Sequence, residues 1–312
     1  MSAPAIELKG LSRAFGAKVA VNDVSFAVRE GDCYGLIGPN GAGKTTTFSM
    51  LCGFLKPTAG TVTVLGIDPF EPGALKGKVG VLPQDALLPT GWPVGALLTY
   101  YGSLTGLAEP EREAREALDR VQLPETWKVK AGTLSHGMAK RVAMAQALMG
   151  APPVILLDEP TAGLDPKISA SVRGLIRELK RKHTVVVSSH NMQELEELCD
   201  ATAILDQGRL VRAASMEEIT GADAEFRVQL ARGAVPLDEV RALSGCREAR
   251  LEGPDVLCVR FDGQGVTAED LITRTVALLA ARGVLLLAVW RGKKLEEKVL
   301  SMTSGPGPVT PR

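Results

Sequence analysis

Short apolar runs alternate with amphipathic segments over the first two thirds of the chain. Residues 33–37 and 154–157 consist mostly of apolar side chains, which is typical of strands buried on both faces of a parallel sheet. Residues 94–105 and 109–121 repeat apolar side chains every three or four positions, which indicates helices. Strands that alternate with helices in this way predict an α/β fold built on an open sheet.

The same pattern predicts the other elements of this region. The expected strands are residues 6–11, 18–21, 24–29, 33–37, 61–65, 78–82, 154–157, 184–188, 201–205 and 209–213. The expected helices are residues 46–51, 94–105, 109–121, 135–149, 166–181, 192–198 and 216–219. The segment from about residue 86 to residue 150 is mainly helical, so we interpret it as a helical subdomain inserted between two halves of the sheet.

The order of the elements changes after residue 224. A strand, a helix, a hairpin, a second helix and a strand are expected at residues 226–230, 237–243, 247–251, 256–261, 268–281 and 284–290. This βαββαβ order predicts a small ferredoxin-like α+β domain, with a last helix at residues 294–302 appended. We therefore expect two domains, residues 1–221 and 222–303, and a Pro/Gly-rich tail, residues 304–312, that is disordered.

The composition of the chain gives no indication of nucleic-acid binding, disulfide bonds or membrane spans. Its 312 residues carry a formal net charge of zero and no Lys/Arg-rich run, so nothing points to nucleic acid as a partner. The five cysteines have no C-x-x-C spacing and are expected to be buried thiols in a reducing compartment. The N-terminus lacks the features of a signal peptide, and the longest apolar stretch, residues 276–290, is too short for a membrane span and is broken by Arg282 and Gly283. We expect a soluble protein, with any membrane spans supplied by another chain.

Residues 38–45 match the phosphate-binding pattern G-x-x-x-x-G-K-[ST] and lie between an expected strand and an expected helix. Glycines let the backbone approach a phosphate closely, and the main-chain N–H groups and the helix N-terminus then point at the anion. Lys44 is expected to reach the β- and γ-phosphates, and the Thr45 hydroxyl to ligate Mg²⁺. The pattern therefore predicts nucleotide binding.

A second acidic element narrows this prediction. Asp158 and Glu159 follow the apolar run of residues 154–157. The carboxyl end of such a strand lies beside the phosphate-binding loop in an open α/β sheet, where ligands collect. Asp158 can hold Mg²⁺ through water, and Glu159 can face the γ-phosphate and polarise the attacking water.

A third motif at the start of an expected helix supports a family resemblance. Residues 134–138, Leu-Ser-His-Gly-Met, resemble the Leu-Ser-Gly-Gly-Gln signature of ATP-binding-cassette (ABC) ATPases. Phe15 stands where that family has an aromatic residue that stacks on adenine. Gln84 matches the Q-loop glutamine, residues 161–165 match the D-loop, and His190 matches the switch histidine.

The resemblance covers roughly residues 5–220 and implies an ABC ATPase of the P-loop NTPase class, with ATP and Mg²⁺ as its ligands. In that family, ATP is held between two ATPase domains arranged head to tail. The implied catalytic residues are Glu159, His190 and Gln84, and the implied Mg²⁺ ligands are Thr45, Gln84 and Asp158. The implied ATP-binding residues are Phe15, Gly38, Pro39, Asn40, Gly41, Ala42, Gly43, Lys44, Thr45 and Thr46. The residues implied to act on the ATP of the other copy are Ser135, Gly137 and Asp165.

The signature departs from the family pattern at two positions, His136 and Met138. Ser135 and Gly137 are retained, so a working site is expected, and we interpret His136 as a solvent-facing spacer. Such variants, together with residues 284–302, resemble exporter ATPases whose membrane domain is a separate polypeptide. The resemblance therefore implies a transmembrane permease as partner, and a cytoplasmic chain held at the inner face of the cell membrane.

Two other functions stay open at this stage. The chain could be the ATPase of an importer whose ferredoxin-like domain senses a small molecule, because sensor domains share this topology and fold does not fix function. It could also be an ABC protein that acts on DNA or ribosomes, although the sequence has none of the long coiled-coil insertions, zinc cysteines or tandem cassettes of those proteins. Trp92 lies in the loop that leads into the helices of the inserted subdomain, where it could face a membrane partner or anchor local packing. The transported substrate cannot be predicted, because the partner chain carries that specificity.

Overall fold

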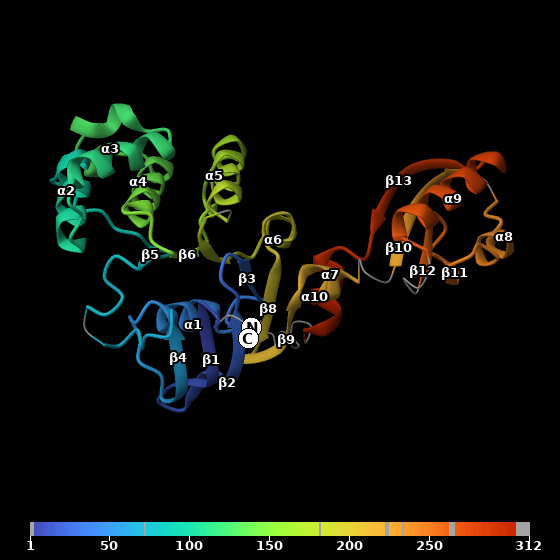
Figure 1. Cartoon of the computed structure of the whole chain (residues 1–312), viewed down its shortest axis with the longest axis horizontal. Helices are drawn as coiled ribbons and strands as arrows, with labels where there is room; N and C mark the ends of the chain where they lie inside the picture. The colour runs from blue at the N-terminus through green and yellow to red at the C-terminus, as the bar shows by residue number, and fades with distance from the viewer. Residues whose placement is uncertain are drawn as a thin grey trace, which may run out of the picture. The chain divides into compact units, whose positions relative to one another are not determined.

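The computed structural model describes residues 3–71, 73–180, 182–221, 225–232, 234–261 and 266–303 (Figure 1). The chain divides into two compact units, a larger one formed by Met1–Ala213 and a smaller one formed by Ala214–Met302. This division precedes the boundary after Gly221 that the sequence suggests. The tail of residues 304–312, which is expected to be disordered, lies outside the described residues.

Six strands form the central sheet of the larger unit, in the order β5-β6-β7-β3-β8-β9. Their bounds are β3 Cys33–Ile37, β5 Val79–Leu82, β6 Val154–Asp158, β7 Thr184–Ser188, β8 Ala201–Asp206 and β9 Arg209–Ser215. The neighbouring strands from β5 to β8 pair in parallel. Every residue of β3, β6 and β7 is buried, which is why their sequences lack the alternation of a half-exposed strand. The prediction of an open α/β sheet is confirmed.

A second, antiparallel sheet has the order β2-β1-β4, with bounds β1 Ile6–Phe15, β2 Lys18–Val28 and β4 Ala59–Val64. The expectation of two separate strands at residues 18–21 and 24–29 is wrong. The chain continues as one strand, in which Asp23 has a positive φ of 55° and the pairing with β1 shifts its register nearby. An irregularity of this kind bends a strand without ending it, and its sequence signal, Asn-Asp, is also that of a turn.

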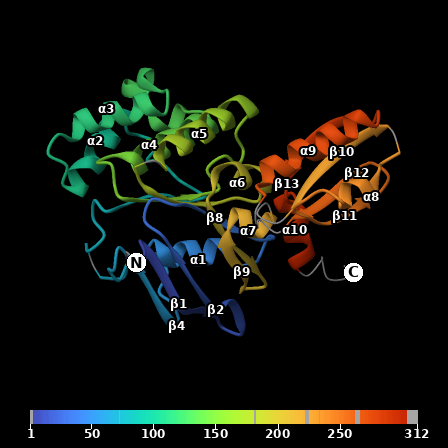
Figure 2. The ribbon, with the colours of Figure 1, turned by 45° about the vertical axis from the view of Figure 1, so that its right-hand side comes forward.

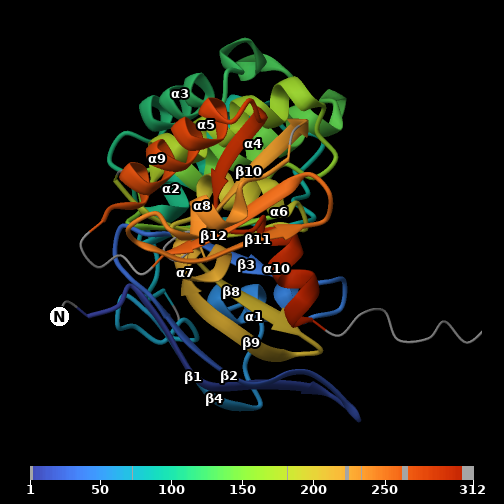
Figure 3. The same ribbon diagram turned by 90° about the vertical axis from the view of Figure 1, so that its right-hand side faces the viewer.

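The larger unit contains the helices α1 Lys44–Leu51, α2 Val94–Thr105, α3 Pro110–Arg120, α4 His136–Leu148, α5 Pro166–Leu179 and α6 Met192–Leu198, with short 3₁₀ turns at Pro124–Lys128 and Ala131–Thr133. Helix α1 contacts strands of both sheets and so joins them. Helices α2, α3 and α4 pack on one another in the segment expected to be a helical subdomain. Helices α3 and α4 lie on the opposite side of the unit from β1, β2 and β4 in each view (Figures 1, 2 and 3).

The smaller unit has its own antiparallel sheet, in the order β11-β12-β10-β13. Its elements are α7 Met216–Thr220, β10 Glu225–Arg232, α8 Leu237–Arg241, β11 Cys246–Glu252, β12 Val256–Phe261, α9 Ala268–Ala281, β13 Leu285–Arg291 and α10 Leu295–Met302. The predicted βαββαβ order is confirmed, and a separate apolar cluster that includes Phe226, Leu257 and Leu271 forms the core of this unit. Helices α7 and α10 contact each other, and Ile219 and Val299 on them are buried.

Truncation after Ser215, the last residue of β9, is expected to leave a folded unit that binds ATP, because every predicted nucleotide-site residue precedes that point. A fragment of residues 1–221 keeps α7 but loses α10, so Met216 and Ile219 become exposed and its solubility should be lower. Thermal melting and ATP binding of both purified fragments measure these outcomes. A fragment of residues 1–215 that is insoluble or fails to bind nucleotide would mean that the smaller unit completes the core of the larger one.

Candidate nucleotide-binding site

The loop between β3 and α1 carries the phosphate-binding pattern of residues 38–45. Gly41 and Gly43 have φ angles of 83° and 100°, in the left-handed region that glycine enters without steric cost. A Cβ at Gly43 would lie 2.7 Å from the carbonyl oxygen of Ala20 in β2. The loop therefore follows a tight path directly against β2. Helix α1 begins at Lys44, which leaves its first N–H groups available to an anion at the loop.

The Lys44 side chain is held within this loop. It is 8% exposed, and its ammonium donates hydrogen bonds to the carbonyl oxygens of Gly38, at 2.6 Å, and Pro39, at 3.2 Å. Burial lowers the pKa of Lys44, while the nearby carboxylates of Glu159 and Asp158 raise it. A charged phosphate oxygen is a stronger partner for an ammonium than a neutral carbonyl is, so this position suits the expected contact with the β- and γ-phosphates.

A pocket of about 550 Å³ opens beside the loop, a size typical of small-ligand sites. The predicted residues that line it are Asn40, Gly41, Gly43, Lys44, Thr45, Thr46, Gln84 and Glu159. Sequence reasoning missed four further lining residues, which are Lys18, Val19 and Ala20 of β2 and Gln207. Gln207 follows the carboxyl end of β8, where ligand-binding loops of parallel sheets gather. Its position after an expected strand was therefore a signal in the sequence for a residue of the pocket. The β2 residues reach the pocket only because the antiparallel sheet lies there, and no local motif indicates that.

The predicted Mg²⁺ ligands supply oxygen donors at or next to this pocket. Thr45 Oγ1 lies 3.4 Å from Gln84 Oε1, so α1 and the loop after β5 meet there. Asp158, at the end of β6, is 2% exposed and accepts a hydrogen bond from the Ser188 hydroxyl. Burial raises the pKa of the Asp158 carboxyl, while that hydrogen bond and Lys44 lower it. Hydroxyl, amide and carboxylate oxygens are the ligands of hard cations, so this donor set fits Mg²⁺.

Glu159 and His190, the expected catalytic pair, are in contact. Glu159 Oε2 lies 2.8 Å from His190 Nδ1. The Glu159 N–H donates hydrogen bonds to the main-chain oxygen of Ser188, at 3.1 Å, and to its hydroxyl, at 3.0 Å. Glu159 has a φ of 50°, in the left-handed region that residues other than glycine avoid. Strain of this kind persists where surrounding contacts over-determine the backbone, and it is frequent at functional sites.

The signature residues form a separate surface at the N-terminus of α4. Ser135 is exposed and caps the helix, because its hydroxyl accepts a hydrogen bond from the Met138 N–H at 3.3 Å. Neither Ser135 nor Gly137 lines the nucleotide pocket described above. His136 is exposed, and its Nε2 would lie 3.1 Å from a Cβ at Gly163, so its ring also rests against the predicted D-loop.

The other predicted residues outside the pocket lining are Gly38, Pro39, Ala42, Asp158, His190, Asp165 and Phe15. The Asp165 carboxylate caps α5 by accepting hydrogen bonds from the N–H groups of Lys167 and Ile168. Phe15 is 49% exposed at the end of β1, and the Arg13 guanidinium lies 4.7 Å from its ring centre. The adenine contact of Phe15 and the action of Asp165 on the other copy stay predictions.

Sequence reasoning also missed two buried charged residues beside Glu159 and His190, the expected catalytic pair. Glu194 Oε2 accepts hydrogen bonds from the hydroxyls of Thr161, at 2.7 Å, and Ser189, at 3.3 Å, and so links the predicted D-loop to the segment that carries His190. Glu194 lies four residues after His190 in the sequence, and that spacing was an available signal. Lys140 on α4 donates to main-chain oxygens of the turn after β6. Nothing local distinguishes Lys140 from an ordinary exposed lysine of a helix.

Comparison with known proteins agrees with this geometry. The family model described as ABC transporter matches residues 21–162. The Nod factor export ATP-binding protein I of Burkholderia orbicola is 34% identical over 275 residues, which cover 86% of this chain and 90% of that protein. The linearmycin resistance ATP-binding protein LnrL of Bacillus subtilis is 30% identical over 307 residues, which cover 96% and 98% of the two chains.

Solved structures resemble the larger part of the chain. An ATP-binding subunit of an ABC transporter matches with a TM-score of 0.65 and 28% identity, over 70% of this chain and 92% of that one. A dimeric ATP-binding cassette in a post-hydrolysis state, bound to ADP and Pi, matches with a TM-score of 0.63 and 26% identity, over 68% of this chain and 98% of that one.

The fold and the pocket define a P-loop ATPase with an inserted group of helices. The chain belongs to the ABC transporter family, in which it is an ATP-binding and ATP-hydrolysing subunit. The resemblance inferred from the sequence motifs is thereby confirmed. Within the described part of the chain, no helix has the length and apolar character needed to cross a membrane.

Lys44→Ala is expected to weaken ATP binding, because it removes the cation that would contact two phosphates. Hydrogen bonds to charged groups contribute roughly 1.5–3 kcal/mol, which corresponds to about one to two decades of affinity. Titration with a fluorescent ATP analogue measures the loss, and Lys56→Ala, at an exposed lysine outside the pocket, is the control. An unchanged affinity in Lys44→Ala would exclude this loop as the phosphate site.

Proposed function

We propose that this chain is the ATP-driven motor of an exporter whose membrane-spanning subunit is a separate polypeptide. The relatives reported above are named for Nod factor export and for linearmycin resistance, and these names favour export over the importer alternative. In this assembly the chain lies on the cytoplasmic side and is held at the inner face of the membrane by its permease partner. The permease selects the substrate.

The observation that carries the proposal is the division of the ATP-site residues between two surfaces. Lys44 and Glu159 line one pocket, whereas Ser135 and Gly137 are presented at the start of α4. The N-terminus of a helix attracts phosphate. Two copies placed head to tail bring Ser135 of one copy to the γ-phosphate bound at Lys44 of the other. The structural match to a dimeric ATP-binding cassette supports this arrangement.

Hydrolysis in such a composite site depends on positioning and charge. Glu159 acts as the base that polarises the attacking water, and His190, 2.8 Å from it, holds either that carboxylate or the γ-phosphate. Lys44 places a positive charge on the phosphates. Thr45, Gln84 and Asp158 would hold Mg²⁺, which when bound neutralises charge on the phosphate oxygens.

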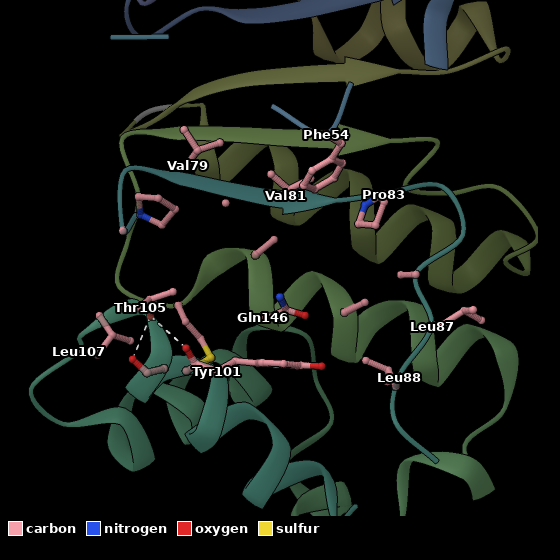
Figure 4. A pocket seen from close by; sticks show the side chains of 18 residues that line it. Phe54, Val79, Val81, Pro83, Leu87, Leu88, Tyr101, Thr105, Leu107 and Gln146 are labelled. Carbon is pink, nitrogen blue, oxygen red and sulfur yellow. Dashed lines mark hydrogen bonds between the residues drawn. The ribbon is translucent and has the colours of Figure 1, made fainter. Parts of the chain in front are cut away.

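An apolar groove of about 330 Å³ offers a contact surface for the permease. Figure 4 shows Val79 and Val81 of β5 on one wall and Tyr101 of α2 on the other, with Leu87 in the loop after β5. Leu87 is 91% exposed, although it is a large apolar side chain. The same loop carries Gln84, so a permease segment that presses on this groove would move a residue of the ATP site.

Trp92 packs on Tyr100, with ring centres 5.5 Å apart, and is still 44% exposed. Trp92 can therefore both anchor local packing and contact a partner.

Glu159→Gln is expected to bind ATP but to lower the hydrolysis rate by about 10²–10⁴-fold, because the amide keeps the size and hydrogen bonding of the carboxylate and loses its basic lone pair. The variant should therefore accumulate an ATP-bound dimer. Gel filtration with ATP and Mg²⁺ detects the dimer, and a phosphate-release assay measures turnover. Glu178→Gln, at an exposed glutamate of α5, is the matched control and should hydrolyse normally. Full turnover in Glu159→Gln would refute the role of this carboxylate.

Ser135→Arg is expected to leave ATP binding by the single chain nearly intact and to block the dimer, because the long side chain occupies the place of the partner's γ-phosphate. The test is gel filtration with ATP and Mg²⁺ in the Glu159→Gln background, with Ser103→Arg on the exposed face of α2 as the control. A mixture of the Ser135→Arg and Lys44→Ala chains should recover part of the dimer, because one composite site in a mixed pair is intact. A mixture without any dimer would contradict the head-to-tail arrangement.

A further inference from the structure

Lys140 is a buried cation between the signature helix and the catalytic turn. It lies on α4, which is capped by Ser135, and it is 7% exposed. Its ammonium donates hydrogen bonds to the main-chain oxygen of Glu159 and, at 3.0 Å, to that of Ala162. Burial of a charge is costly unless hydrogen bonds satisfy it, so a buried lysine at this point calls for an explanation beyond the packing of α4.

The Glu159 backbone is fixed from two sides. Its N–H donates to Ser188 at the end of β7, and its carbonyl oxygen accepts from Lys140 and from the Ala162 N–H, the latter at 3.2 Å. Between these anchors Glu159 keeps the unfavourable φ of 50°. That backbone conformation directs the carboxylate to His190 and into the nucleotide pocket. Without the ammonium, one anchor is lost, and the turn can relax towards ordinary backbone angles.

We infer that Lys140 is a positioning residue for hydrolysis: it holds the Glu159 carbonyl so that the carboxylate points at the attacking water, and it ties that carboxylate to the signature helix. This inference deepens the proposed function and rests on it. Lys140 does not line the nucleotide pocket, so it acts on the chemical step and not on ATP binding. Because Ser135 and Lys140 belong to one helix end, a shift of α4 when Ser135 meets the partner's γ-phosphate moves the anchor of Glu159. The helix thereby links the two composite ATP sites.

The test compares Lys140→Met with Arg141→Met. Methionine keeps much of the apolar stem and removes the donors. Arg141, the next residue of the same helix, also donates to main-chain oxygens, those of Val121 at 3.2 Å and Gln122 at 3.5 Å, which lie away from the catalytic turn. Lys140→Met is expected to lower kcat about 10- to 100-fold, with the KM for ATP changed less than about twofold, because a small misplacement of a catalytic group costs rates of this order. Arg141→Met should keep kcat within about twofold of the unmodified chain.

Two further variants separate positioning from general support of the fold. Lys140→Arg keeps donors for two carbonyl oxygens and should recover most of the lost kcat. Lys140→Met added to Glu159→Gln should still form the ATP-bound dimer, because that double variant does not need a correctly aimed carboxylate. Gel filtration with ATP and Mg²⁺ and thermal melting report on both.

Specific outcomes overturn the inference. The first three concern kcat: an unchanged kcat in Lys140→Met, equal losses of kcat in Lys140→Met and Arg141→Met, or a loss of kcat that Lys140→Arg does not restore. The fourth is a Lys140→Met, Glu159→Gln double variant that no longer dimerises with ATP although Glu159→Gln alone does. Failure of Glu159→Gln itself to dimerise with ATP would refute the proposed head-to-tail motor instead, so the two failures are distinguishable.

Discussion

The parallel pairing of β6, β7 and β3 positions the predicted nucleotide-site residues relative to one another. Ser188 pairs with Asp158 on one side and with Leu36 on the other, so the three strands end in one row. Parallel strands point their carboxyl ends to the same edge of a sheet. The phosphate-binding loop, the Asp158-Glu159 pair and the switch histidine therefore meet without long connections. Every residue of these strands is buried, so a slip of one residue would exchange the side chains of two packed faces and spoil their fit; core packing therefore holds the site in register.

Because the strands end at one edge of the sheet, several charged side chains are buried close together there. Hydrogen bonds to neighbouring groups offset part of the free-energy cost of burying these charges. The Asp158 carboxylate accepts a hydrogen bond from Ser188, and Lys44 donates one to Gly38 in the preceding loop. One oxygen of Glu194, Oε2, accepts hydrogen bonds from the Thr161 and Ser189 hydroxyls. Removal of one partner from such a network leaves the other buried and unpaired, which is more costly than loss of the single bond. The network therefore stabilises one arrangement of the site strongly and tolerates intermediate ones poorly.

Local sequence patterns were enough to predict that the phosphate-binding loop and the acidic residues meet at one edge of the sheet. They were not enough to predict the residues that hold these groups in place. Uninterrupted apolar runs marked β3 and β6, and the residues after each run carried recognisable phosphate and acidic motifs. The continuity of β2 through Asp23 could not be predicted, because a bulge and a turn use the same residue types. Lys140 was missed because its partners are main-chain oxygens that only the tertiary fold brings near, and main-chain oxygens carry no sequence signal. The sequence suggests a boundary after Gly221, whereas the compact units divide after Ala213, because α7 packs against α10, a helix from the far end of the chain.

The division of the ATP site explains, in the proposed assembly, how phosphate chemistry becomes movement. Lys44 is the first residue of α1, the helix that joins the two sheets. Ser135 caps α4, and residues of α4 line the same groove as Leu87. Lys44 and Ser135 can share a γ-phosphate only when a second copy is present, so the energy of that shared contact is available only in the closed pair. Loss of the γ-phosphate on hydrolysis removes the same contact, and the closed state then loses its advantage over the open one. A stiff sheet with a separately packed helical group suits this task, because closure requires rigid parts to change position and leaves their cores intact.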